Sequence, residues 1–296
     1  MSEKLNKIYK NSKRLKIDNE TKLVIMSDCH RGSGNNLDNF IKNKNIFKAA
    51  LNHYYNNGFS YIELGDGDDM WEVDDYNEII REHLDIFKLL RKFNTSDRLF
   101  MIYGNHDKCK KSKHILKKYF YTYYDEVNKK YEKLLDNLEV YESLVLVYNE
   151  HDIFLLHGHQ GDLLNDNLWY LSRFLVRYFW KNLEHGGIKD PTSAAKNYKI
   201  TKKTEKRLTK WSNKNNKMVI TGHTHRPVFP KIGQGLYFND GSCIHPSGIT
   251  CLEIENGKIT LVKWLFKVRK DKVIFVGREV LKGKELIENF FTKCED

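Results

Sequence analysis

The first third of the chain alternates two hydrophobic patterns. Short continuous apolar runs are typical of buried strands, whereas apolar positions three and four residues apart are typical of one face of a helix. The runs lie at 23–27, 61–64 and 99–103, and the helical spacing lies at 40–55 and 76–93. Because strands that alternate with helices form parallel sheets, this pattern predicts an α/β fold with a parallel β-sheet.

Apolar runs continue through the rest of the chain. The runs at 153–156 and 218–221 predict two strands that end at polar residues. Asn256-Gly257 predicts a tight hairpin turn between two later strands, and a terminal helix is predicted over 284–293. Two stretches with helical patterns, about 110–138 and 163–216, are expected to be insertions. The later strands are predicted at 236–239, 249–254, 259–264 and 273–276.

The composition is that of a folded, basic protein. Hydrophobic residues make up 40% of the 296 residues and prolines number 4, which argues against extended disorder. No internal repeat or linker divides the sequence, so we expect one domain over 1–296. The formal net charge of +11 suits an anionic partner, such as a phosphorylated metabolite, a nucleic acid or an anionic membrane surface.

The cysteines and the N-terminal sequence bear on location. The chain has 5 cysteines, an odd number, and none forms a C-x-x-C pair. This usage favours reduced thiols, so we expect a cytoplasmic protein. The first 20 residues lack the apolar stretch of a secretory signal, and no window approaches the ~20 apolar residues of a membrane span. Peripheral membrane contact remains open.

Metal-ligand side chains follow five of the predicted strands. Each group pairs a glycine, which allows a sharp turn, with aspartate, asparagine or histidine. Mn, Fe and Zn bind imidazole nitrogen together with carboxylate or amide oxygen. Ligands in parallel sheets gather beyond the carboxyl ends of the strands, so five such groups predict a metal site. The groups are Asp28-Cys-His30, Gly65-Asp66-Gly-Asp-Asp69, Gly104-Asn-His-Asp107, His157-Gly-His159 and Gly222-His-Thr-His225.

In this order, the five groups resemble the motifs of the calcineurin-like metallophosphoesterase family. Each motif alone is weak evidence, but the ordered set is specific, and it spans about 23–239. The resemblance implies a two-sheet β-sandwich flanked by helices. It also implies that the insertions at about 110–138 and 163–216 form a helical cap over the strand ends.

The resemblance implies a role for each motif residue. One divalent ion would be held by Asp28, His30, Asp66 and His225. The other would be held by Asp66, Asn105, His157 and His223, with Asp66 bridging the two ions. His106 would be the proton donor, oriented by Asp69.

This arrangement predicts hydrolysis of a phosphoester. Two ions about 3.5–4 Å apart lower the pKa of a shared water and stabilise an in-line displacement at phosphorus. A metal-bound hydroxide would attack, and His106 would protonate the leaving group. The ligand set accepts two ions of Mn, Fe, Zn, Ni or Co without choosing among them.

The sequence narrows the substrate only in part. The arginine that follows the second aspartate motif in protein phosphatases is absent, because Asp66 is followed by Gly67. The Gly-Asp-x-x-Asp-x-Trp pattern resembles the branch of UDP-diacylglucosamine pyrophosphatases, although the loop after His157 differs from theirs. Arg173 and Arg177 begin a basic stripe, with Lys181, on an apolar helical stretch. These arginines and His159 are candidate contacts for an anionic phosphoester; a buried helix whose cationic side chains reach water would give the same stripe.

Two other functions stay open on the sequence. A non-catalytic metal-binding interaction scaffold of the same fold is the main alternative, although His106 and every implied ligand are present. A nuclease ranks third, since repair nucleases share Gly-Asn-His-Asp but no nucleic-acid-binding motif accompanies it here. Oligomeric state is not predicted.

Overall fold

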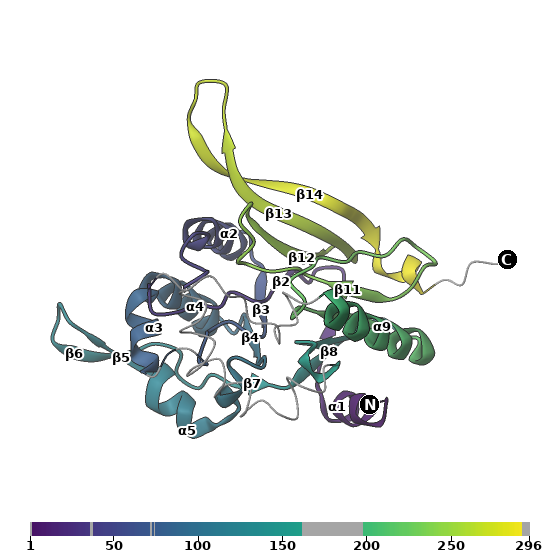
Figure 1. Cartoon of the computed structure of the whole chain (residues 1–296), viewed down its shortest axis with the longest axis horizontal. Coiled ribbons are helices and arrows are strands. Elements are labelled where there is room, and N and C mark those ends of the chain that lie inside the picture. Colours follow the sequence, from purple (N-terminus) through teal and green to yellow (C-terminus); the bar gives the residue numbers. More distant parts are fainter. Residues whose placement is uncertain (1, 36–37, 72, 74, 162–197, 292–296) are drawn as a thin grey trace.

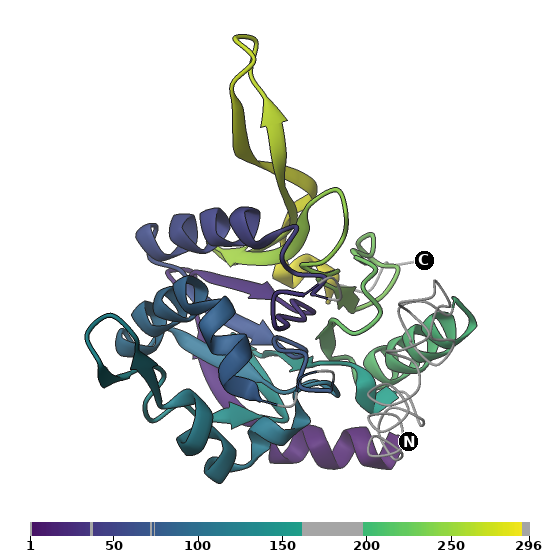
Figure 2. The same ribbon diagram turned by 60° about the vertical axis from the view of Figure 1, so that its left-hand side comes forward.

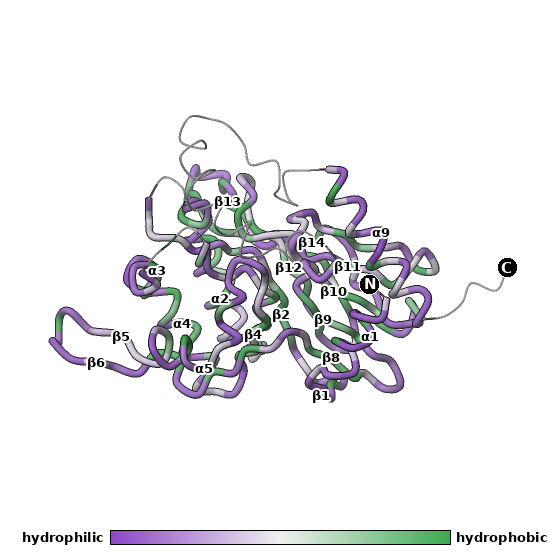
Figure 3. The backbone as a smooth tube through the Cα atoms, turned by 60° about the horizontal axis from the view of Figure 1, so that its bottom comes forward, coloured by the Kyte–Doolittle hydropathy of each residue, from purple (hydrophilic) through white to green (hydrophobic). Residues whose placement is uncertain are grey.

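Two β-sheets packed face to face form the centre of the computed structural model, with helices on both outer sides (Figure 1). The structure describes residues 2–35, 38–71, 73, 75–161 and 198–291. Figure 3 shows that apolar positions gather along the strands, whereas the hairpin of β5 (Thr122–Asp125) and β6 (Lys130–Lys133) is mostly hydrophilic.

The first sheet has seven strands, and its central part is parallel. Strands β2, β3 and β4 pair in parallel, and all three therefore end at the same edge of the sheet. β12 lies antiparallel against β2, and it joins β13 through the two-residue turn Asn256-Gly257, as expected. The sheet order is β14 (Ile274–Leu286), β13 (Lys258–Val268), β12 (Ile249–Glu255), β2 (Leu23–Met26), β3 (Ser60–Leu64), β4 (Leu99–Ile102) and β7 (Val140–Tyr141).

The second sheet has five strands. β9, β10 and β11 run parallel to one another, whereas β8 and β9 form an antiparallel hairpin. The sequence analysis did not predict β1 or β8. The sheet order is β1 (Lys13–Ile17), β8 (Ser143–Tyr148), β9 (His151–Leu156), β10 (Met218–Thr221) and β11 (Tyr237–Asn239).

Alternate residues of the strands face different apolar layers. Leu23 and Ile25 of β2 lie in the cluster between the sheets, and Val24 and Met26 lie in the cluster under the helices. The helical layer over the seven-stranded sheet contains α2 (Lys44–Asn56), α3 (Tyr76–Glu82) and α4 (Leu84–Thr95). A third cluster joins α1 (Ser2–Asn11) and α9 (Tyr198–Asn215) to the five-stranded sheet. The predicted helix-flanked, two-sheet sandwich is therefore confirmed.

The helix predicted over 76–93 is divided in two. His83 leaves the helical conformation between α3 and α4. Its buried ring lies 2.9 Å, Nε2 to Oδ2, from Asp38 of the loop after β2. The break therefore coincides with a contact that holds this loop.

Two other helix predictions were wrong in part. The first insertion, 110–138, has short helical segments at η1 (Lys108–Lys111), α5 (Lys113–Ile115) and η2 (Leu116–Phe120), but it continues as a hairpin of β5 (Thr122–Asp125) and β6 (Lys130–Lys133). The predicted terminal helix is instead the end of β14, followed by η5 (Ile287–Phe290). Pairing with β13 extends this strand, and Ile287 and Phe290 turn into the cluster between the sheets.

The second predicted insertion is described only at its end. α9 packs on β10 and β11, so it covers the outer face of the five-stranded sheet. The remainder of that insertion, residues 163–197, lies outside the described residues. Among the helices that the structure describes, none is long and apolar enough to cross a membrane.

A buried ion network joins the loops that follow β2, β3 and β4. Arg31 donates to both carboxylate oxygens of Glu63, each at 2.8 Å, and to Asp68 at 2.5 Å. Lys110 contacts Asp68 at 2.6 Å and Asp107 at 2.9 Å. Burial would raise the pKa of Asp68, but the charges of Arg31 and Lys110 outweigh burial and lower this pKa to about 2. All five residues are at most 2% exposed.

We predict that Lys110→Met strongly destabilises the metal-free protein. Removing one cation leaves Asp68 and Asp107 buried with less compensation, which costs about 3–5 kcal/mol. Lys111→Met is the matched control, because Lys111 is exposed and its loss should change the free energy of unfolding by at most about 0.5 kcal/mol. Urea unfolding with a chelator present measures both, and equal midpoints for the two variants would contradict a stabilising network.

Candidate metal centre

The candidate ligands lie on five loops at the carboxyl ends of β2, β3, β4, β9 and β10. Backbone hydrogen bonds continue the pairing of β2 and β3 into their loops, from Asp28 N to Gly65 O at 3.0 Å and from His30 N to Asp66 O at 2.9 Å. The loops after β9 and β10 are joined in the same way by Gly222 N and His157 O. Each sheet thus presents a fixed group of loops at one end of the sandwich.

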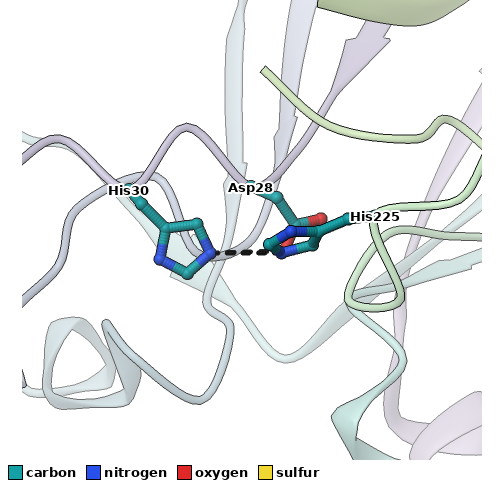
Figure 4. Close-up of side chains that lie close together, drawn as sticks. All are labelled: Asp28, His30 and His225. Carbon is teal, nitrogen blue, oxygen red and sulfur yellow. Dashed lines mark hydrogen bonds and ion pairs between the residues drawn. The ribbon is translucent and has the colours of Figure 1, made fainter. Parts of the chain in front are cut away.

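The first cluster contains Asp28, His30 and His225 (Figure 4). His225 Nε2 lies 3.0 Å from Asp28 Oδ1 and 3.3 Å from His30 Nε2. The other oxygen of Asp28 accepts hydrogen bonds from Ser27 Oγ and His223 N. Asp28 Oδ1 is therefore directed at the two imidazoles. Asp28 and His30 follow β2 of the seven-stranded sheet, whereas His225 follows β10 of the five-stranded sheet.

The second cluster contains Asp66, His157 and His223. His157 Nδ1 donates to the carbonyl of Leu64 at 2.9 Å, because a carbonyl only accepts. In its neutral, metal-binding form this ring would present an unprotonated Nε2, and that atom lies 3.1 Å from Asp66 Oδ2. Orientation of a ligand histidine by a backbone carbonyl is common in metal sites.

Asp66 lies between the two clusters. Its Oδ2 is 3.1 Å from His157 Nε2 in the second cluster and 3.8 Å from His30 Nε2 in the first. His157 Nε2 is also 3.9 Å from Asp28 Oδ1. Asp66 is thus placed to contact ligands of both clusters.

The donor atoms fit divalent metal binding. Asn105 is 3% exposed, and its Oδ1 has no hydrogen-bond partner within the described ranges. Burial would lower the pKa of His157, but the charges of Asp66 and Asp28 outweigh burial and raise it to about 9. Imidazole nitrogens and buried carboxylate oxygens lie close together here. A divalent cation binds both kinds of atom.

The backbone at these positions is strained. Asp28, His30, Asp66, His223 and His225 all have left-handed φ angles, between 48° and 67°. Each such residue costs of the order of 1 kcal/mol or more, because Cβ crowds the carbonyl oxygen. Strain of this kind clusters at functional sites and is offset by the surrounding structure. The loops therefore hold these side chains in place at a cost in stability.

Two glycines are required by close approach. A Cβ at Gly104 would collide with the carboxylate of Asp66, and one at Gly222 would lie 2.5 Å from Asp28 Oδ2. Each glycine therefore lets one loop's backbone lie against the carboxylate of another loop.

His106 lies beside the first cluster. Its Nδ1 donates to Asp69 Oδ1 at 3.0 Å, and Asp69 Oδ2 lies 3.6 Å from His30 Nδ1. Burial lowers the pKa of His106, but the charges of Asp69 and Asp66 outweigh it and raise the pKa above the ordinary value. The indole of Trp71 stacks on the imidazole, with ring centroids 4.1 Å apart and planes 20° apart. The ring is thus held at its edge and on its face.

The remaining predicted contacts differ in how far the structure describes them. His159 is 1% exposed and lies against His157 and His223, with centroids 5.6 and 6.5 Å away. Burial and the positive charge of His157 keep the pKa of His159 well below its ordinary value. Arg173 and Arg177 lie outside the described residues.

The sequence analysis missed a polar relay behind Asp28. Ser27 Oγ lies 2.5 Å from Asp28 Oδ2 and 2.7 Å from Asp240 Oδ1. Burial and the charge of Asp28 raise the pKa of Asp240 well above its ordinary value, so a protonated Asp240 can donate to the hydroxyl while the hydroxyl donates to Asp28. The available signal was position, because Asp240 directly follows β11, as the other ligands follow their strands.

Several known proteins resemble the chain. A predicted phosphoesterase from Streptococcus pneumoniae is 14% identical, with 88% of this chain and 97% of that chain covered and a TM-score of 0.34. Vacuolar protein sorting 29 from Cryptosporidium parvum is 14% identical over 89% and 98% of the two chains, with a TM-score of 0.41. A cold-active protein-tyrosine phosphatase from Shewanella sp. is 14% identical over 90% and 82%, with a TM-score of 0.40. No curated protein matches the chain.

The model of the calcineurin-like phosphoesterase family matches residues 21–227, which is more than half of the chain and includes every loop of the metal centre. The motifs, the helix-flanked sandwich and the two ligand clusters agree with this match. The chain belongs to the calcineurin-like phosphoesterase family.

Proposed function

We propose that this protein is a hydrolase that cleaves a phosphoester with two divalent metal ions. The observation that carries the proposal is the position of Asp66, whose carboxylate lies between two histidine-containing ligand clusters. One ion would be held by Asp28, His30, Asp66 and His225. The other would be held by Asp66, Asn105, His157 and His223. Such ions activate water for attack on phosphorus and stabilise the charge that develops there.

The protein's own contribution to the reaction centres on His106. Its Nδ1–H donates a hydrogen bond to Asp69. Nε2 is therefore the atom that would give a proton to the leaving-group oxygen. The ionised Asp69 favours the imidazolium, and the Trp71 stack restricts rotation of the ring. A positioned acid of this kind contributes roughly 10²–10⁴-fold to the rate.

The substrate that we propose is an anionic phosphodiester, pyrophosphate or phosphomonoester. The net charge of +11 supports an anionic ligand. Lysines are frequent along α9, whose Glu205 contacts Thr224 between His223 and His225. We further propose that His159, Arg173 and Arg177 contribute to substrate binding, and that the insertions at 110–138 and 163–216 form the cap. A likeness to the branch of UDP-diacylglucosamine pyrophosphatases is proposed on the Gly-Asp-x-x-Asp-x-Trp pattern alone, in which the tryptophan is Trp71.

We predict that Asp66→Asn loses metal and activity together. The substitution removes the charge that both clusters face, so bound metal should fall from two equivalents to one or fewer. Activity should fall by more than about a hundredfold, since even residues that only orient ligands contribute 10–100-fold. Elemental analysis after dialysis, and hydrolysis of bis-p-nitrophenyl phosphate and p-nitrophenyl phosphate with Mn, Ni, Co, Zn or Mg restored, measure both quantities.

The control for this experiment is Asp85→Asn. Asp85 lies on α4, where it pairs with Lys44 and Lys48. This variant should keep both its metal and its activity. A wild-type protein that binds two equivalents but hydrolyses neither ester nor any pyrophosphate would contradict the hydrolase proposal and support an interaction scaffold.

We predict that His106→Ala retains both ions and loses activity in a substrate-dependent way. Phenyl phosphate esters have poor leaving groups, so their hydrolysis should fall about 10²–10³-fold. Esters of p-nitrophenol need little protonation and should lose less than about tenfold. Comparing kcat on the two ester types, with exposed His114→Ala as control, tests the role. Equal losses on both esters would refute proton donation by His106.

A further inference from the structure

The ribbon formed by β13 and β14 extends beyond the sheet. Ile249, the first residue of β12, lies opposite Trp264, so residues 265–268 of β13 pair only with 274–277 of β14. Figure 2 shows this part, residues 265–277, projecting away from the body of the molecule. We call it the β13–β14 arm. At about 3.4 Å per residue it reaches ~20 Å beyond the last residue that β12 supports.

One face of the arm is apolar without interruption. Phe266 lies opposite Val276, and Val268 lies opposite Ile274, so the four side chains share one face. Val276 packs against the cluster under the helices. The others are progressively more exposed toward the tip, at 49% for Phe266, 68% for Val268 and 67% for Ile274. This face therefore continues the hydrophobic side of the sheet into solvent.

The tip of the arm is basic. Residues 267–272 contain four cations, Lys267, Arg269, Lys270 and Lys272, and one anion, Asp271. Lys267 pairs with Glu279, and Arg269 pairs with Asp271. Lys270 and Lys272 have no ion-pair partner in the described part of the chain, and both are exposed.

We propose that the β13–β14 arm docks on an anionic lipid bilayer. A bilayer offers anionic head groups directly above an apolar layer, which matches a basic tip adjoining an apolar face. The two apolar pairs are two residues apart, a span of ~7 Å, and interfacial elements bury their apolar side about 5–10 Å deep. A second copy of this chain fits less well, because two tips of like charge would repel. Within the described residues, the arm is a narrow two-stranded ribbon and offers no groove that a protein ligand could fill. A flat bilayer surface therefore suits it better.

The test measures binding of the full-length protein to sedimented vesicles of phosphatidylcholine, with and without phosphatidylglycerol. We expect binding to the anionic vesicles, weakened by salt. Lys270→Gln/Lys272→Gln should lower the partition coefficient about 25-fold, at about fivefold for each cation. Val268→Ser/Ile274→Ser should lower it at every salt concentration.

The β5–β6 hairpin supplies matched controls. Val127 is 89% exposed there, and Lys129 and Lys130 give an equal change of charge. Lys129→Gln/Lys130→Gln and Val127→Ser should leave vesicle binding within about twofold of the wild type. All substituted side chains are exposed, so circular dichroism should report unchanged folding. This test needs no catalytic activity, so it is independent of the proposed hydrolase.

Three results would overturn the proposal. The first is no binding to anionic vesicles, and the second is an equal loss in the arm and control variants. The third is self-association of the wild type in sedimentation equilibrium that Val268→Ser/Ile274→Ser abolishes, which would assign the arm to a second copy. Binding to poly-glutamate without binding to vesicles would assign it to an acidic protein.

Discussion

The guanidinium of Arg31 is the contact on which the geometry of the metal centre depends. The guanidinium pairs with Glu63 near the end of β3 and with Asp68 in the loop beyond. The backbone of Arg31 also hydrogen-bonds to the backbone of Gly67 and Asp69. The loops after β2 and β3 are thereby locked in one register, and Lys110 extends the lock to the loop after β4. The left-handed residues Asp28, His30 and Asp66 all lie on the loops that this pairing joins. Rigid support of this kind is what places ligands within a fraction of an ångström.

The candidate site was more predictable than the elements around it. Glycine with aspartate, asparagine or histidine after an apolar run is a local pattern, so it can be read without knowing which strands are neighbours. Arg31 contacts Glu63 and Asp68 across 32 and 37 positions of sequence, and Lys110 contacts Asp68 across 42 positions, and no local pattern encodes these contacts. Asp240 was not predicted for a similar reason, because it joins the site through a hydrogen bond with Ser27, which is 213 positions away in the sequence.

The wrong helix predictions have a common physical cause. Residues 122–133 contain lysine, glutamate and tyrosine, and residues 284–286 contain lysine and glutamate, which suit either a helix or an exposed ribbon. Pairing with a neighbouring strand decided between them, and such pairing is a tertiary effect that outweighs weak local preference. The buried strands β2, β3, β9 and β10 were predictable because their apolar runs are bounded by polar residues and are too short for a helix.

The position of β12 has a consequence for the order in which the chain can fold. β2 lies between β3, which follows it closely in the sequence, and β12, which begins 226 residues after β2 begins. During synthesis from the N-terminus, β2 therefore has a bare edge until residues 249–255 emerge. An unpaired apolar strand is a hazard for aggregation, and non-local pairing is slow. The most vulnerable stage for this protein is thus the one at which the ligands are all synthesised but the central strand β2 still lacks one of its two neighbours.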